Sequence, residues 1–156
     1  MPADAKNRQA VRDAVAAGLN TALVAGGTGI VTAVYGYHKG DIKGESPVVL
    51  VMSRGMDRMQ WGQGTQKYRS QVYLEVLVFV ADAETLQTPT WTDQAVEDRL
   101  DEIEKEIADW VADNRAMTGV YAYLEHNGQS EVFAVAIGGK PWTMERIILQ
   151  AEAFDG

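Results

Sequence analysis

The sequence predicts an α+β fold: an antiparallel-rich sheet with two main helices, one N-terminal and one central, packed on it, and a long loop extending between two strands. Two segments, 4–24 and 92–114, repeat apolar residues at the spacing of a helix. The runs 48–52 and 68–81 and most of the C-terminal third are rich in β-branched residues or alternate as strands do. Strands follow one another with few helices between them, so we expect antiparallel pairing with the helices on one face. We expect a single domain over 1–156.

The first helix is expected to run from Asp4, a suitable N-cap, to about Val24. The GGTG segment, 26–29, is expected to end it, because glycine accepts the left-handed conformation of a helix stop. A phosphate-binding loop is disfavoured, since such a loop follows a strand and opens a helix, the reverse of the order here. A strand is expected next at Ile30–Tyr37. The apolar stripe of the helix consists of Val11, Val15, Leu19 and Leu23.

The segment 53–67, between the strands Val48–Met52 and Tyr68–Ala81, is predicted to be a long loop. Hairpin loops usually have about two to five residues, and longer loops in compact domains are usually functional or disordered. Methionines, a tryptophan and arginines gather here, a mixture enriched at protein–protein contacts. A surface loop without a partner is the alternative interpretation. The expected contact residues are Arg54, Met56, Arg58, Met59, Trp61 and Arg69.

The central helix is expected to begin after a cap at Thr90 or Thr92 and to run to about Asn114. Its apolar residues form one seam, which suits packing onto a sheet face or a partner helix. Between Asp93 and Asp113 there are nine acids and two bases, a net charge of −7, whereas 54–69 has four bases and one acid, a net charge of +3. The molecule is therefore expected to carry opposite net charges at two separate regions, and such a molecule can associate head to tail.

The acids of the central helix mostly face like charges at four-residue spacing, with Asp101 and Lys105 as the main favourable pair. One interpretation is a solvated face. The other is a partner or lumen surface formed by Asp98, Asp101, Glu102, Glu106 and Asp109.

The C-terminal third is predicted to contain three strands. Val120–His126 and Glu131–Ile137 are expected to form a hairpin around Asn127 and Gly128, a dipeptide typical of two-residue turns. The GGKPW segment, 138–142, is expected to interrupt the chain before a last strand at Thr143–Phe154.

Composition and motifs argue against a catalytic site. The chain has no cysteine, which excludes a disulfide scaffold, a thiolate nucleophile and a cysteine zinc site. His38 and His126 stand near turns without ligands at motif spacing, and they are expected to be exposed or to form hydrogen bonds. Glu75 has the pattern of a partly buried acid, and a sheet-surface or ion-paired role is favoured over a catalytic one. We therefore expect no enzyme activity, no cofactor and no metal ion.

Charge and hydropathy also limit the classes of partner that we expect for this protein. A net charge of −8 argues against general nucleic-acid binding, which depends on neutralising phosphates. The N-terminal segment lacks the apolar core of a signal peptide, and no stretch approaches the roughly 20 apolar residues of a membrane span. We expect a soluble protein made in the cytoplasm.

The order of the elements resembles a known family. An N-terminal amphipathic helix, the strand that begins at PVVLV, an arginine-bearing loop, the long strand YRSQVYLEVLVFV, the helix DRLDEIEKEIADWV and a C-terminal hairpin closing on GGKPWTMERIILQAEAF together look like the tail terminator, or tail-completion, proteins of long-tailed bacteriophages. The resemblance covers nearly the whole chain and rests on order, length and pattern.

The resemblance implies a homo-hexameric ring that caps the tail tube, ends tube polymerisation and offers a docking surface to head-completion or connector proteins. The arginine-bearing segment would contact a neighbouring subunit or the tail tube protein. The acidic helix would suit a lumen through which DNA passes without being specifically bound. The protein would be located in the virion, at the head-proximal end of the tail, after synthesis in the host cytoplasm.

Two alternatives stay open. A head-to-tail connector, or neck protein, or the tail tube subunit itself would share the ring and the acidic balance, but a tube subunit should polymerise whereas a terminator should stop at a ring or a monomer. A small cytoplasmic enzyme or ligand-binding module would need a deep pocket with convergent polar groups.

Overall fold

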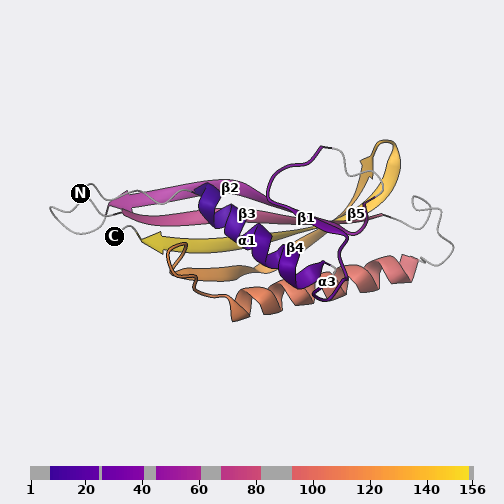
Figure 1. Ribbon diagram of the computed structural model, residues 1–156. Coiled ribbons are helices and arrows are strands. Elements are labelled where there is room, and N and C mark those ends of the chain that lie inside the picture. Colours follow the sequence, from indigo (N-terminus) through magenta and orange to yellow (C-terminus); the bar gives the residue numbers. More distant parts are fainter. Residues whose placement is uncertain (1–7, 25, 41–44, 61–67, 82–92, 155–156) are drawn as a thin grey trace.

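The computed structural model describes residues 8–24, 26–40, 45–60, 68–81 and 93–154, and these residues have the predicted α+β fold (Figure 1). Within these ranges, two helices and five strands follow one another in the order α1 (Arg8–Leu23), β1 (Ala33–Tyr35), β2 (Val48–Gln60), β3 (Tyr68–Ala81), α3 (Asp93–Asp113), β4 (Tyr123–Ile137) and β5 (Lys140–Phe154).

The strands form one sheet in the order β1-β2-β3-β5-β4. Pairing is antiparallel at every junction except the parallel contact of β1 with β2. The central strand β3 joins the two halves, because its Val76 lies opposite Val51 of β2 on one side and Ile147 of β5 on the other. The prediction of an antiparallel-rich sheet is therefore confirmed.

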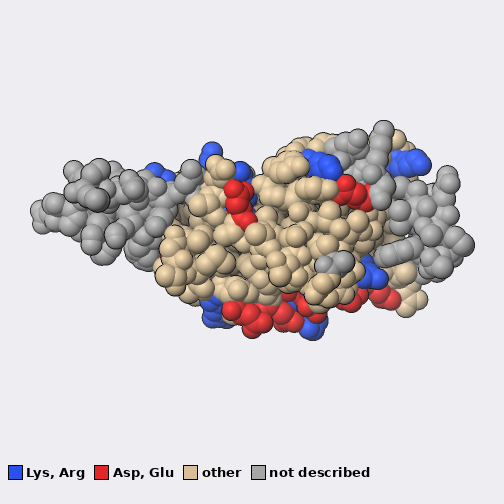
Figure 2. Space-filling model, in the orientation of Figure 1, with Lys and Arg blue, Asp and Glu red and all other residues tan. Residues whose placement is uncertain are grey.

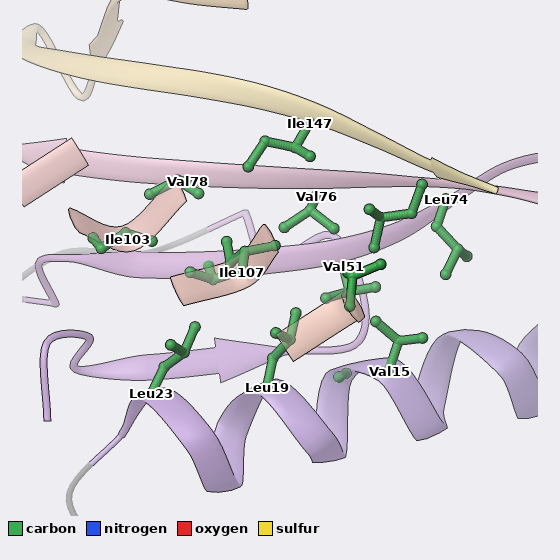
Figure 3. Close-up of a cluster of buried hydrophobic side chains, with 14 of the residues drawn as sticks. Val15, Leu19, Leu23, Val51, Leu74, Val76, Val78, Ile103, Ile107 and Ile147 are labelled. Atoms are coloured by element: carbon green, nitrogen blue, oxygen red, sulfur yellow. The ribbon is translucent and has the colours of Figure 1, made fainter. Parts of the chain in front are cut away.

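Both described helices pack on one face of the sheet, which we call the helix-covered face. The valine and leucine residues that alternate along β3 point to this face, as the sequence predicts. Burying each such side chain gains about 1.5–3 kcal/mol, so the apolar stripes of both helices hold the layers together. Figure 3 shows Val15, Leu19 and Leu23 of α1 and Ile103 and Ile107 of α3 gathered with Val51, Leu74, Val76, Val78 and Ile147 of the sheet.

The opposite face of the sheet has a smaller apolar cluster. It consists of Val48, Leu50, Leu77, Ala81 and Trp142, all buried. Further along β3 the same face becomes polar, because Glu75, Tyr73 and Gln71 alternate with the core residues. Along β3, this face is therefore apolar at one end of the strand and polar at the other.

The predicted loop 53–67 is wrong over its first half, because β2 continues to Gln60. Asp57 lies opposite Gln71 and Met59 opposite Arg69, which makes this segment part of an antiparallel ladder. A register shift between Ser53 and Gly55 takes up one extra residue, as in a β-bulge. Polar side chains do not prevent this pairing, since an antiparallel strand needs apolar residues only on a covered face. Residues 61–67 lie outside the described residues.

The predicted hairpin at Asn127 and Gly128 is also wrong. β4 runs through both residues with a register shift between His126 and Ser130, and Gly128, with φ 85°, lies within this irregularity. The turn lies instead at Gly138 and Gly139, whose φ values of 60° and 77° suit a two-residue loop that connects Ile137 to Lys140. β5 therefore begins at Lys140, three residues before the predicted Thr143.

The remaining boundaries differ less from the predictions. α1 ends at Leu23, and Gly26 with φ 103° follows it, which confirms the helix stop. The strand expected at Ile30–Tyr37 is shortened to Ala33–Tyr35. The predicted caps Asp4, Thr90 and Thr92 lie outside the described residues.

Candidate assembly surfaces

The expected contact residues that the structure describes lie on two paired strands. Ser53–Gln60 of β2 and 68–73 of β3, which we call the basic arm, extend past the start of α1 in Figure 1. Arg54 stands at the register shift and is exposed, as is Arg58. Met59 has 62% of its surface exposed. Trp61 lies outside the described residues.

The arm divides the predicted contact residues between two faces. Met56 lies on the helix-covered face, where it packs against the main core and accepts a hydrogen bond on Sδ from Arg58 Nη2 at 3.0 Å. Met59 and Arg69 face each other on the opposite face. The described members of the predicted contact set therefore do not share one face of the sheet. Met56 has a role in packing, which leaves Arg54, Arg58 and Met59 as the accessible members.

On the sheet face opposite the helices, side-chain bonds hold the arm to the neighbouring strand and hold its two strands together. Arg69 is ion-paired with Glu152, which joins β3 to β5. The Tyr73 hydroxyl is 2.9 Å from Asp57 Oδ2 and can donate a hydrogen bond to it, and this contact raises the pKa of Tyr73. The arm's acid and one of its bases thus serve to hold strands together, and the exposed charge that remains is positive.

The outer side of α3 is acidic. Four of the five predicted surface acids are exposed, and Glu106 is half-buried. Figure 2 shows red Asp and Glu atoms gathered along the margin of the molecule that α3 occupies in Figure 1. The exposed acids are Asp98, Asp101, Glu102 and Asp109.

The expected pairing of Lys105 with Asp101 is wrong. Lys105 Nζ lies 2.7 Å from Asp109 Oδ2, one turn further along α3, and this hydrogen bond raises the pKa of Lys105. Arg99 Nε lies 3.8 Å from Glu102 Oε2. Such exposed pairs contribute at most about 1 kcal/mol each. Neither of these two pairs involves Asp98 or Asp101, which are exposed on the same helix.

A buried carboxyl that the sequence did not reveal lies under α3. Glu145 of β5 is 5% exposed, and the Ser130 hydroxyl of β4 donates a hydrogen bond to its Oε2 at 2.6 Å. Burial is the main cause that raises the pKa of Glu145, and the nearby charges of Glu104 and Asp101 raise it further. One signal was available: Glu145 alternates with Ile147 and Leu149, which places it on the helix-covered face.

His126 of β4 lies close to Glu104 of α3, one of the acids near Glu145. Its Nδ1 accepts a hydrogen bond from the backbone N–H of Gly128 at 2.9 Å, and its Nε2 lies 3.5 Å from Glu104 Oε1. This confirms the hydrogen-bonding role expected for His126, while His38 is exposed. Within the described ranges, no group of three or more histidines, cysteines or acids is arranged to hold a metal ion.

Glu75 is ion-paired, as the sequence favoured. Arg146 of β5 lies between two acids, with Nη1 3.5 Å from Glu75 Oε1 and Nη2 2.8 Å from Glu131 Oε2. Its guanidinium also lies 5.5 Å from the ring centre of Phe133, a distance suited to a cation–π contact. The arrangement ties three strands together on the opposite face.

The hollows described on the surface are small. One of about 290 Å³ is lined by residues 116–122. Another, of about 370 Å³, lies beside the arm and is lined by Arg54, Tyr73, Asn127, Ile148 and Gln150. Among the described helices, none is long and apolar enough to cross a membrane.

Neither the protein-family models nor the curated proteins compared with this chain match it. The functional interpretation therefore depends on the residues and on the resemblance in the order of elements.

Proposed function

We propose that this chain is a structural virion protein that forms a ring, a homo-hexamer by analogy with tail terminators, on the head-proximal end of a bacteriophage tail tube. The ring ends tube polymerisation and offers its other side to head-completion or connector proteins. The protein is not an enzyme and needs no cofactor. It is made in the host cytoplasm, and DNA passes through the ring without specific binding.

The observation that carries the proposal is the separation of charge across the sheet. β2, with Arg54 and Arg58, lies along one margin of the molecule, and α3, with its exposed acids, lies along the other (Figure 1). A surface that attracts a different surface of the same molecule gives a heterologous contact, which closes into a ring when the rotation between copies allows it. Like charges at each margin also disfavour a two-fold dimer.

The acidic side of α3 supports the second part of the proposal. Polyanionic DNA gains no counterion release from a carboxylate surface, so such a surface does not retain DNA in a channel. Because exposed acids such as Asp98 and Asp101 contribute little to the stability of the helix itself, a role in assembly or in the lumen accounts for them better than packing does.

The proposal is tested by measuring mass in solution and imaging the protein with isolated tail tubes. We expect discrete rings that bind tube ends and stop elongation. The variant Arg54→Ala with Arg58→Ala should keep its fold by circular dichroism and lose end-capping, whereas Arg115→Ala, which removes an exposed arginine far from the arm in sequence, should keep capping. A stable monomer that ignores tubes contradicts the proposal, and unlimited polymers of the protein alone indicate a tube subunit instead.

A further inference from the structure

Two margins of the sheet have strand edges that no described strand covers. β1 pairs with β2 only at Val48–Leu50. The outer side of Met52–Met59, which we call the β2 edge, therefore has no described strand beside it. β4 pairs with β5 on one side, and along Ser130–Ile137, the β4 edge, its other side has no strand beside it in the described ranges. Backbone N–H and C=O groups along such edges are a template for a strand from another chain.

The β4 edge is unusually apolar for an edge. Val132 is 60% exposed and Phe133 is 36% exposed, and they lie on the two different faces of the sheet. Glu131 supplies the sole charge in the segment SEVFAVAI, and its carboxylate is already held by Arg146. Natural edges are usually protected by charges, prolines or short length. This one has none of these over Val132–Ile137, which indicates that a partner strand covers it.

We infer that the β4 edge of one copy pairs antiparallel with the β2 edge of the next copy, so that one sheet continues from subunit to subunit. The inference rests on the proposed self-assembly and names the surfaces that meet. Topology supplies the direction. β2, β3, β5 and β4 alternate in direction within the sheet, so a following copy in the same orientation places its β2 antiparallel to β4.

Charge favours this pairing over pairing between like edges. On the helix-covered face, α3 brings Glu104 to His126 of β4. On the same face, Arg58 lies on the β2 edge, and Arg12 of α1 donates a hydrogen bond from Nη1 to Ser53 Oγ at 3.3 Å. A continuous sheet keeps the helix-covered faces on one side, so the acids of one copy meet the arginines of the next. Pairing β4 with β4 would bring two acidic helices together, and pairing β2 with β2 would bring arginines together.

The positions of the two edges also suit a closed assembly. Across the sheet, Met56 of the β2 edge is in register with Val72 of β3 and so with Ala151, near the end of β5. Val132 of the β4 edge lies opposite Glu145, near the start of β5. Joining these edges shifts each copy along the strand direction relative to the last. Such a stagger with tilted strands is what closing a sheet into a barrel requires.

The inference is tested by cysteine cross-linking, which the chain permits because it contains no cysteine. Val132→Cys on the helix-covered face is combined in turn with Ser53→Cys, Met56→Cys or Arg58→Cys on the same face of β2. A disulfide forms only when the two Cα atoms approach within about 7 Å and the Cβ atoms point toward each other. At least one of these pairs should link copies into a ladder of covalent multimers on a non-reducing gel.

Matched controls place the second cysteine on the opposite face. Val132→Cys combined with Asp57→Cys or Met59→Cys should give no ladder, because adjacent strands in one sheet cannot bridge side chains from different faces. Mixing subunits that carry only Val132→Cys with subunits that carry only the reactive β2 cysteine should give dimers and nothing larger, as expected for a contact between unlike edges.

Three results separate the inference from the proposed function. Rings that form while every same-face pair stays unlinked overturn the edge pairing and leave the proposed ring intact. Dimers formed by the Val132→Cys subunit alone show pairing of β4 with β4 and also overturn it. A wild-type protein that stays monomeric at every concentration and on tube ends overturns both.

Discussion

Gly18 on α1 faces the indole of Trp110 on α3 so closely that a Cβ at position 18 would lie 2.1 Å from Cζ2 of Trp110 and 2.9 Å from Cε2. Trp110 in turn packs against the main core. The two helices therefore approach each other across a glycine, and this approach lets both reach the same face of the sheet.

Gly18→Ala is expected to destabilise the protein. Alanine favours a helix over glycine by about 1 kcal/mol. A close-packed site that must accept an extra methyl group loses about 1–3 kcal/mol, because the indole or a helix has to move. We expect a net loss of about 1 kcal/mol in the free energy of unfolding, measured by urea denaturation.

A double-mutant cycle separates the clash from other effects of Gly18→Ala. In a Trp110→Leu background the smaller side chain leaves room for the new methyl group, so Gly18→Ala should there be neutral or stabilising. An equal loss in both backgrounds would show that the contact with Trp110 is not the cause.

The turn between β4 and β5 gives a second prediction. Gly138 has φ 60° and Gly139 has φ 77°, a backbone region that costs other L residues about 1–2 kcal/mol. Gly138→Ala should therefore lower the free energy of unfolding by about that amount, while Gly40→Ala, at an exposed glycine without positive φ, should change it by less than about 0.5 kcal/mol. Equal effects of the two substitutions in thermal or urea unfolding would contradict the assignment of the turn.

Assembly should weaken as salt rises. The exposed charges of Arg58 and of the α3 acids act through water, where the screening length falls from about 10 Å at 0.1 M ionic strength to about 3 Å at 1 M. Sedimentation velocity should show rings dissociating across this range at constant protein concentration. Rings that tighten with salt would indicate a contact dominated by apolar surface such as Val132 and Phe133.

Hydrophobic periodicity predicted the layers correctly because burial on one face imposes it. The spacing of Leu19 with Leu23 and of Ile103 with Ile107 identified both helices, and the alternation along β3 identified the covered face. The second half of β2 carries no such signal, since Asp57 and Met59 face away from the core. The predicted strand therefore ended at Met52, where the run of apolar residues ends.

Two dipeptides that contain glycine show why local sequence preference did not predict the position of the turn. Asn127-Gly128 and Gly138-Gly139 both permit a tight turn, and local preference alone favours the first. Long-range pairing decided between them, because a turn at Gly138 and Gly139 lets β4 pair with β5 on both sides of the irregularity at Gly128. The sequence shows where the charged residues gather, but the division of the arm residues between two faces depends on the β2–β3 register and its shift between Ser53 and Gly55.

Glu145 gives the last prediction, a dependence of stability on pH. Its burial, with the nearby charges of Glu104 and Asp101, raises the pKa of this carboxyl above the ordinary 4.5. Between the unfolded and the folded pKa, the folded protein holds a proton that the unfolded chain has lost, so the contribution of Glu145 to the free energy of unfolding falls as pH rises through this window. Above the folded pKa the folded state bears the full cost of the buried charge.

Glu145→Gln removes that charge and keeps an oxygen that can accept the hydrogen bond from Ser130. Its free energy of unfolding should exceed that of the wild type by about 1 kcal/mol at neutral pH, and the difference should shrink toward zero as the pH falls below the ordinary glutamate value. Urea unfolding of both proteins across this range measures it. Glu97→Gln, at an exposed position on α3, is the control and should show a much smaller difference. A variant at position 145 that is less stable than the wild type at neutral pH would instead show that the ionised carboxylate holds β4 to β5 through Ser130.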